Sequence, residues 1–509
     1  MRVRISQIIP VPLFLTAFSV RLYSLLHFGG MLSVLGYDDG VYYSAANGLI
    51  HGQLPYRDYI LVHPPGILIL LSPFALLGRI VGDSTGLIAA RLAFMILGSI
   101  TTVFIYLIAR KLSLYAGLVA GFTYALWYPA IIVERTSYLE AIGLFSIAVA
   151  LFMIQKSDFS RRNYIVAGAL LGLSTATKLW FAIPVIVIGV WLLIQRRIKE
   201  AIIIYFTSFV TFLTVVSFFW IKAGSKFIHL ILFAQLNRSS ATSNLASRIS
   251  RIFNLETFST SIFTSNDKYL IFASIFICII LLARIILEHR IVSLWLLLFL
   301  AQIAILLKTP TFFQAYPSYI APTFALLIGA LTFLIQKFFH GFRAARGVVS
   351  VAITISIFSF CWHGIYLANR GEITPINFLR DVTTSQRCVA ADSPIILAIS
   401  NSLTSDFANK CQVIFDVNGT IYGVEEPAGS KLLTATERRK RSLQYQNDLI
   451  RYFEKSDIFI LNRISADGLA KKSLIQIERK KFIEQRNGFV AYIQKSSEKW
   501  NKSGPALSK

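Results

Sequence analysis

Two adjacent carboxylates, Asp38 and Asp39, are the residues whose type and position most clearly suggest chemistry in this chain. They follow the first apolar segment directly, so two strongly solvated groups lie close to lipid if that segment crosses a membrane. Ionisable residues next to a bilayer are costly and by default indicate a functional site. One carboxylate could act as a general base toward a hydroxyl group. The pair could instead hold a divalent cation, Mg²⁺ or Mn²⁺, against a phosphate, or the loop could simply be solvated.

Seven further polar residues are candidates for binding a substrate. They are Arg57, Asp58, His63, Glu134, Glu140, Lys178 and Tyr316. The ammonium group of Lys178 could bind a phosphate as a point charge. Alternatively, the side chain could extend along apolar surface and place its charge at the membrane surface. Tyr316 could also be a member of an aromatic belt at the membrane surface. Glu134 could also pair with the neighbouring Arg135 or face water.

Composition assigns the chain to the membrane class. Of its 509 residues, 55% are hydrophobic, against about 45–50% in a soluble globular protein. Several apolar runs approach the roughly 20 residues that a helix needs to cross a bilayer. Much of the +24 net charge lies in short loops between these runs, where membrane topology accounts for it. Binding of nucleic acid is therefore not expected.

The apolar runs predict eleven transmembrane helices within a membrane domain of residues 1–368. The expected spans are Ile8–Phe28, Leu87–Ala109, Leu114–Ile131, Tyr138–Ile154, Tyr164–Thr177, Leu179–Ile194, Ala201–Trp220, Tyr269–Leu287, Ile291–Leu307, Tyr319–Ile335 and Val348–Leu367. The run within residues 67–80 is short and contains Pro73, so it predicts an interfacial helix rather than a crossing.

Basic residues in alternate short loops predict the orientation of these spans. When the more basic loops are cytoplasmic, the N-terminus is cytoplasmic and the C-terminus is outside. The loop 29–66, which contains the two aspartates, then faces the exterior. The long outer loop Lys222–Lys268 carries the cations Lys226, Arg238, Arg248 and Arg251 between its ends. Long loops tolerate such charge, or these cations form a basic patch for an anionic ligand.

After residue 368 the composition changes to that of a small α/β domain, residues 369–494, followed by a polar tail, 495–509. Expected strands alternate with two expected helical stretches. The strands are Pro394–Ser400, Gln412–Val417, Asp457–Leu461 and Gly488–Gln494, and the helical stretches are Thr434–Glu454 and Gly468–Glu478. Cys388 and Cys411 could form a disulfide if this domain is exported.

The order of these motifs resembles that of the membrane glycosyltransferases of the C superfold (GT-C). This superfold includes protein O-mannosyltransferases and aminoarabinose transferases of lipid A. The likeness rests on Tyr37-Asp38-Asp39-Gly40 after the first span and on His63-Pro64-Pro65-Gly66 before a juxtamembrane helix. It also includes Arg91, placed like an arginine common in these proteins. The resemblance implies a catalytic acidic pair with its first aspartate as base, and acceptor or donor contacts near Glu140, Lys178 and Tyr316.

The function implied is transfer of a sugar, a mannose-like hexose or a pentose, from a polyprenyl-phosphate donor. The acceptor would be a hydroxyl group of a glycan, lipid or protein on the outer face of the cell membrane. No cofactor is certain, and a divalent cation held by Asp38 or Asp39 is one option. A multi-pass transporter or flippase is the alternative class, although the chain has no matching halves.

Overall fold

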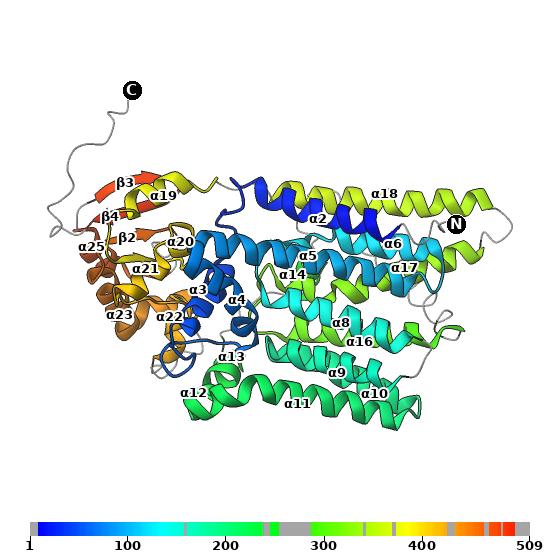
Figure 1. Cartoon of the computed structure of the whole chain (residues 1–509). Helices are drawn as coiled ribbons and strands as arrows, with labels where there is room; N and C mark the ends of the chain where they lie inside the picture. The colour runs from blue at the N-terminus through cyan, green and yellow to red at the C-terminus, as the bar shows by residue number, and fades with distance from the viewer. Residues whose placement is uncertain are drawn as a thin grey trace.

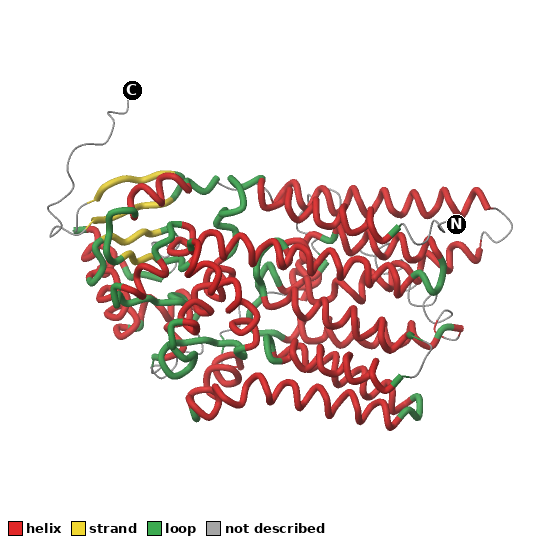
Figure 2. The backbone as a smooth tube through the Cα atoms, viewed as in Figure 1, coloured by secondary structure: helices red, strands yellow, loops and turns green. Residues whose placement is uncertain are grey.

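The computed structural model describes residues 9–156, 160–236, 238, 245–253, 286, 288–338, 343–368, 373–424, 433–462, 468–479 and 482–493. Most of these residues are helical, and a small sheet lies at one end of the helical bundle (Figure 1 and Figure 2). Apart from Ile286, the predicted span Tyr269–Leu287 lies outside the described residues, as does the predicted tail 495–509.

Most helices of the first 368 residues follow the expected apolar runs, but the helix Tyr37–Ile50 lies in the predicted loop 29–66 and the short helices between residues 225 and 252 lie in the predicted loop Lys222–Lys268. Their bounds are α2 (Pro10–Leu26), α3 (Tyr37–Ile50), α4 (Gly66–Val81), α5 (Asp83–Ala109), α6 (Leu114–Leu126), α7 (Tyr128–Glu134), α8 (Leu139–Gln155), α9 (Arg161–Thr175), η1 (Leu179–Phe181), α10 (Ala182–Ile194), α11 (Ile198–Ala223), α12 (Ser225–Ile228), η2 (His229–Phe233), α13 (Ala234–Leu236), α14 (Leu245–Ile252), α16 (Arg290–Lys308), η5 (Tyr316–Ile320), α17 (Ala321–Phe338) and α18 (Arg343–Ala368).

Five helices of the described chain are long and apolar enough to cross a membrane. They lie at Asp83–Ala109, Ile198–Ala223, Arg290–Lys308, Tyr316–Lys337 and Gly347–Tyr366, and α6 with α7, bent by 59°, makes a sixth candidate. The prediction of eleven spans also counted α2, α8, α9 and α10, which are shorter than the roughly 20 residues of a full crossing, and Tyr269–Leu287, which lies almost wholly outside the described residues. The protein is thus a multi-pass helical membrane protein.

A tight turn at Gly82 joins α4 to α5. Gly82 follows the last residue of α4 and precedes the first residue of α5, with φ +110°. This backbone conformation favours glycine, because glycine has no Cβ. The helix predicted at residues 67–80 corresponds to α4, which contains Pro73. Whether α4 lies in the membrane interface stays a prediction.

The last part of the described chain contains a four-stranded mixed sheet. Its strands are β1 (Val389–Ala391), β2 (Ile458–Leu461), β3 (Phe482–Arg486) and β4 (Phe489–Ile493), in the order β1-β2-β4-β3. β1 is parallel to β2, and the other neighbours are antiparallel. Helices surround the sheet: α19 (Ile376–Thr383), α20 (Ile395–Ile399), α21 (Leu403–Ala408), η6 (Gly419–Gly423), α22 (Ala435–Arg441), α23 (Leu443–Glu454) and α25 (Lys471–Glu478). We refer to residues 373–493 as the C-terminal domain.

Two of the four predicted strands are wrong. Pro394–Ser400 forms the short helix α20, whose residues are buried on every side, and a short apolar run cannot distinguish a buried helix from a strand. Gln412–Val417 is irregular and forms no strand. Asp457–Leu461 and Gly488–Gln494 correspond to β2 and β4. Cys388 and Cys411 form a disulfide with a Cα–Cα distance of 5.6 Å.

The C-terminal domain and the membrane part share a hydrophobic core around α3. Val41 and Tyr43 of α3 belong to the same buried cluster as Ile395 of α20 and Ile458 of β2. The backbones of α3 and α20 touch at Gly40, because a Cβ there would lie 2.4 Å from the backbone nitrogen of Ile395. The helix that carries the two aspartates is therefore packed directly against the C-terminal domain.

We expect Gly40→Ala to lower stability, although alanine normally stabilises a helix by about 0.5–1 kcal/mol relative to glycine. The added methyl group has no room, and overpacking of a core costs about 1–3 kcal/mol. Thermal unfolding of the purified protein in detergent measures the effect. Gly347→Ala in α18 is the control, because its Cβ would meet nothing closer than 4.0 Å. Equal gains in stability for both variants would contradict the close contact of α3 and α20.

Candidate active site

Asp38 and Asp39 lie in the first turn of α3, after the extended residue Gly36. The free backbone N–H groups of a helix N-terminus favour carboxylates at these positions. Successive side chains of a helix point about 100° apart, so the two carboxylates face different surroundings. Asp39 is fully buried, whereas Asp38 is partly exposed.

Asp39 is held by a buried ion pair and by the turn before α8. Its Oδ2 accepts hydrogen bonds from Nε of Arg91 at 2.9 Å and from Nη2 of Arg91 at 2.5 Å. Its Oδ1 accepts from the backbone N–H of Ser137 at 2.9 Å and from the Ser137 hydroxyl. Arg91 also donates to the carbonyl oxygens of Met31 and Ser33. Asp39 thereby fixes α3 against α5 and the α7–α8 connection.

Asp38 has no hydrogen-bond partner among the described residues, and four charged groups surround it. Burial raises the pKa of the Asp38 carboxyl to about 6, and the neighbouring carboxylates of Asp416 and Glu140 add to the rise. The cations of Lys178 and Arg238 oppose it. A carboxylate that is accessible, unpaired and poised near neutral pH has the properties required of a general base.

Asp416 brings the C-terminal domain into this cluster. The Tyr37 hydroxyl donates to Oδ1 of Asp416 at 2.9 Å and accepts from the backbone N–H of Asn418 at 2.8 Å. The N–H of Gly419 donates to the same carboxylate oxygen at 2.8 Å. Burial raises the pKa of Asp416 as well. The sequence analysis missed Asp416, although Asp416-Val417-Asn418-Gly419 is a turn signature that argues against the strand predicted there.

Lys178 is enclosed rather than extended toward the membrane surface. Its Nζ lies 2.5 Å from a carboxylate oxygen of Glu140, and both side chains are about 95% buried. The same ammonium lies 4.3 Å from the ring centre of Trp180 and 4.4 Å from that of Tyr316. Three predicted site residues, Glu140, Lys178 and Tyr316, therefore meet in one group next to Asp38.

Arg238 is the cation of the long loop that faces this group. Its Nη1 lies 3.5 Å from the Tyr316 hydroxyl, and its guanidinium lies 5.6 Å from the ring centre of Tyr422. Its buried Nε has no hydrogen-bond partner in the part of the chain that the structure describes. Arg248 and Arg251 instead donate to backbone carbonyl groups of residues 306–312.

His63 lies in the same surroundings as a neutral side chain. Burial and the nearby charges of Lys178 and Arg238 hold its pKa well below the usual range. Its ring makes an edge contact with Tyr42, the two centres lying 6.2 Å apart, and its carbonyl oxygen accepts from the Tyr56 hydroxyl at 2.6 Å. A neutral imidazole can both donate and accept a hydrogen bond.

The other predicted residues lie elsewhere. Glu134 is fully buried in α7. It pairs with Arg21 of α2 and accepts a hydrogen bond from the Tyr124 hydroxyl of α6 at 2.6 Å, so it joins these three helices. Arg57 and Asp58 form an exposed ion pair at 2.7 Å, and Asp58 also accepts from the backbone N–H of Leu54. Neither residue of this pair approaches Asp38 through a contact in the described chain.

Asp38 and Asp39 do not fit a shared cation site in this structure. Both oxygens of Asp39 are engaged by Arg91 and Ser137, so a cation at this carboxylate would compete with these partners. The described residues contain no group of three or more histidine, cysteine or acidic side chains arranged for a metal ion. A dependence on Mg²⁺ or Mn²⁺ stays a prediction, which activity measured with a chelator would test.

Comparison with known proteins adds a family and a fold. The family model of glycosyltransferase family 87 matches residues 61–335. The structure is similar to that of ArnT from Cupriavidus metallidurans bound to undecaprenyl phosphate, with a TM-score of 0.58 and 14% identity over 96% of this chain and 98% of ArnT. It is also similar to the oligosaccharyltransferase AglB from Archaeoglobus fulgidus, with a TM-score of 0.56 and 12% identity over 97% of this chain and 75% of AglB. No curated protein matches the chain by sequence.

The buried pair of Asp39 and Arg91 yields a prediction about stability. Asp39→Asn leaves the Arg91 charge buried without a counter-charge, and breaking a buried pair in this way costs about 3–5 kcal/mol. Glu288→Gln is the control, because Glu288 pairs with Lys337 at the exposed surface and such pairs contribute about 0–1 kcal/mol. Denaturation of both variants in detergent measures the difference. Equal stabilities would mean that Arg91 is compensated by other groups.

Proposed function

The chain belongs to glycosyltransferase family 87, and we propose that it transfers a sugar from a polyprenyl-phosphate donor to an acceptor hydroxyl on the outer face of the membrane. The sugar is a mannose-like hexose or a pentose, and the acceptor is a glycan, a lipid or a protein. Family membership makes the protein an enzyme, a membrane-bound glycosyltransferase of the C superfold. The observation that carries the rest of the proposal is the accessible carboxylate of Asp38 beside a group of cations.

Asp38 acts as the general base. Its carboxylate takes the proton of the acceptor hydroxyl while the acceptor oxygen bonds to the anomeric carbon of the sugar. The bond between that carbon and the phosphate oxygen breaks, and its electron pair leaves with polyprenyl phosphate. Attack from the face opposite the phosphate inverts the anomeric configuration. Asp39, which is fully buried and paired with Arg91, positions Asp38 rather than reacting itself.

The cations next to Asp38 bind the phosphate. Lys178 and Arg238 supply positive charge, and Tyr316, which lies between them, supplies a hydroxyl group. The leaving phosphate is a stable anion, so its neutralisation is the main electrostatic task of the site. The structures that support this donor class are ArnT bound to undecaprenyl phosphate and AglB in complex with a dolichol-phosphate.

The membrane topology that fits this function has eleven spans, a cytoplasmic N-terminus and an external C-terminal domain. The disulfide between Cys388 and Cys411 supports the external location, because disulfides persist mainly in oxidising compartments. A polyprenyl-phosphate sugar, unlike a nucleotide sugar, is available on that side of the membrane. A transporter or flippase, the alternative class, would leave the family membership unexplained.

We expect Asp38→Asn to lower the transfer rate by about 10²–10⁴-fold, the usual contribution of a general base. The variant should fold at pH 7 at least as well as the native protein, because ionising a carboxyl group whose pKa is raised costs stability. Transfer from a panel of radiolabelled polyprenyl-phosphate sugars in membranes provides the measurement. Asp381→Asn, the same change at an exposed position of the C-terminal domain, is the control. Full activity of Asp38→Asn would exclude Asp38 as the base, and no transfer by native protein from any donor would exclude the donor class.

The pH dependence of transfer offers an independent test of Asp38 as the base. A base with a pKa of about 6 is protonated below that pH, so the rate should fall as the pH drops through 6 and level off above it. Asp416→Asn removes a neighbouring negative charge, so the pKa of Asp38 should fall and the decline should move to lower pH. Asp381→Asn, at an exposed position of the same domain, should leave the profile unchanged. A profile unaltered by Asp416→Asn would mean that Asp416 does not act on the base.

A further inference from the structure

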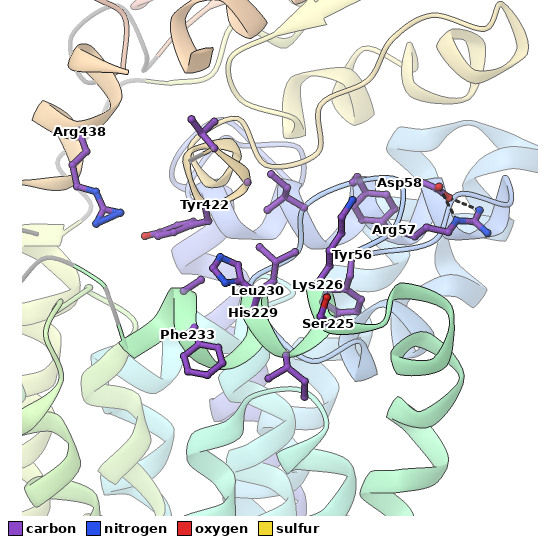
Figure 3. Close-up of a pocket in the computed structure, with 16 residues that line it drawn as sticks. Tyr56, Arg57, Asp58, Ser225, Lys226, His229, Leu230, Phe233, Tyr422 and Arg438 are labelled. Atoms are coloured by element: carbon purple, nitrogen blue, oxygen red, sulfur yellow. Dashed lines mark hydrogen bonds and ion pairs between the residues drawn. The ribbon is translucent and has the colours of Figure 1, made fainter. Parts of the chain in front are cut away.

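A large cavity lies between the membrane part and the C-terminal domain, beside the group around Asp38. Its volume is about 1000 Å³, at the upper end of the roughly 300–1,000 Å³ typical of small-molecule sites. The loop before α4 and the segment Ser225–Ala234 line one side, and Tyr422 and Arg438 of the C-terminal domain line the other. Figure 3 shows Arg438 at one end of the cavity and Arg57 at the other.

The described residues that line the cavity carry a net positive charge. They include the cations Arg57, Lys226 and Arg438 and the carboxylate of Asp58. Asp58 is already paired with Arg57 at 2.7 Å. Lys226 is exposed and has no partner among the described residues. Arg438 is 94% buried, so an anion that reaches it meets a guanidinium largely removed from water, where charge–charge attraction is stronger than at the surface.

Aromatic side chains line the same space. Tyr56, Tyr59 and Tyr422 contribute aromatic rings, which suit the apolar face of a sugar ring. The hydroxyl groups of Tyr56 and Tyr59 already donate to the carbonyl oxygens of His63 and Ala45. Phe233 adds a further ring at the membrane side. The lining therefore combines the features needed for a carbohydrate with those needed for a negative charge.

The cavity adjoins the proposed base through two of its lining residues. The ring of Tyr422 lies 5.6 Å from the guanidinium of Arg238, and Arg238 is one of the charges that act on Asp38. On the other side, the Tyr56 hydroxyl donates to the carbonyl oxygen of His63, whose side chain lies near Lys178 and Arg238. Tyr422 and Tyr56 thus connect the cavity lining to the residues that surround Asp38.

We propose that this cavity binds the acceptor and that the acceptor is an anionic glycan, whose carboxylate or phosphate groups contact Lys226 and Arg438. The assignment deepens the proposed function and rests on it. The donor phosphate and the acceptor charge then have separate cations: Lys178 and Arg238 hold the donor, and Lys226 and Arg438 hold the acceptor. Because Tyr422 and Arg438 come from the C-terminal domain, that domain contributes to the choice of acceptor.

Direct binding tests the proposal without depending on turnover. The full-length protein in nanodiscs of phosphatidylcholine is titrated with fluorescently labelled tetramannuronate and with mannotetraose, which differ in their carboxylates. We expect tetramannuronate to bind at least about tenfold more tightly, since a hydrogen bond to a charged group is worth one order of magnitude or more. Lys226→Gln and Arg438→Gln should each weaken tetramannuronate binding about tenfold and leave mannotetraose unchanged.

Matched variants separate a local effect from misfolding. Lys222→Gln and Arg441→Gln change exposed cations nearby that do not line the cavity, and both should bind like the native protein. Arg438→Lys keeps the charge and should retain most of the binding. Lys226 is exposed, so its variant remains informative even if Arg438→Gln fails to fold.

Three outcomes would overturn the inference. These are equal affinity for the two tetrasaccharides, unchanged binding in Lys226→Gln, and displacement of tetramannuronate by phosphatidylglycerol added to the nanodisc, which would assign the cavity to a lipid headgroup instead. Each would leave the proposed transfer reaction intact, because Asp38→Asn and the donor panel test that reaction separately.

Discussion

The ion pair between Asp39 and Arg91 determines where the proposed base can lie. Two carboxylates in one helical turn would repel each other if both faced the same space. Here Arg91 neutralises one of them inside the protein and binds it to α5, while Ser137 ties it to the start of α8. The neighbouring carboxylate, turned by about 100° on the helix, is left accessible. Burying an ion pair costs desolvation free energy. In this fold the buried pair fixes the direction of α3.

The site depends equally on the contact between the membrane part and the C-terminal domain. Tyr37, the first residue of α3, bonds to Asp416 and Asn418, and Gly40 three residues later packs on the backbone of α20. The common core of α3, α20 and β2 makes these contacts rigid. The C-terminal domain is thus a wall of the site and of the adjoining cavity, and it supplies a carboxylate, a tyrosine and an arginine to them.

Much of the helical architecture and part of the site could be read from the sequence. Apolar length predicted the helices, because a membrane leaves few alternatives to a helix, and the order of motifs led to Asp38, Glu140, Lys178 and Tyr316. The sequence could not separate Asp38 from Asp39, since that difference arises from Arg91 and Ser137, which lie far along the chain. It missed Asp416 because the contact of Asp416 with Tyr37, 379 residues earlier in the chain, leaves no local pattern. Pro394–Ser400 was misassigned because a short buried run has no useful period, and Gln412–Val417 was misassigned because the turn signature that begins at Asp416 was overlooked.

The bond between Tyr37 and Asp416 also has a consequence for biosynthesis. The two residues stand near opposite ends of the chain, and the sheet beside Asp416 is completed only by β3 and β4, at residues 482–493. Chains fold from the N-terminus as they are made, so all membrane helices precede the last part of the site. A nascent chain that has inserted its helices therefore carries Asp38 without its neighbour and without a closed cavity. The proposed site is therefore completed only after the membrane helices and the strands β3 and β4 have been made.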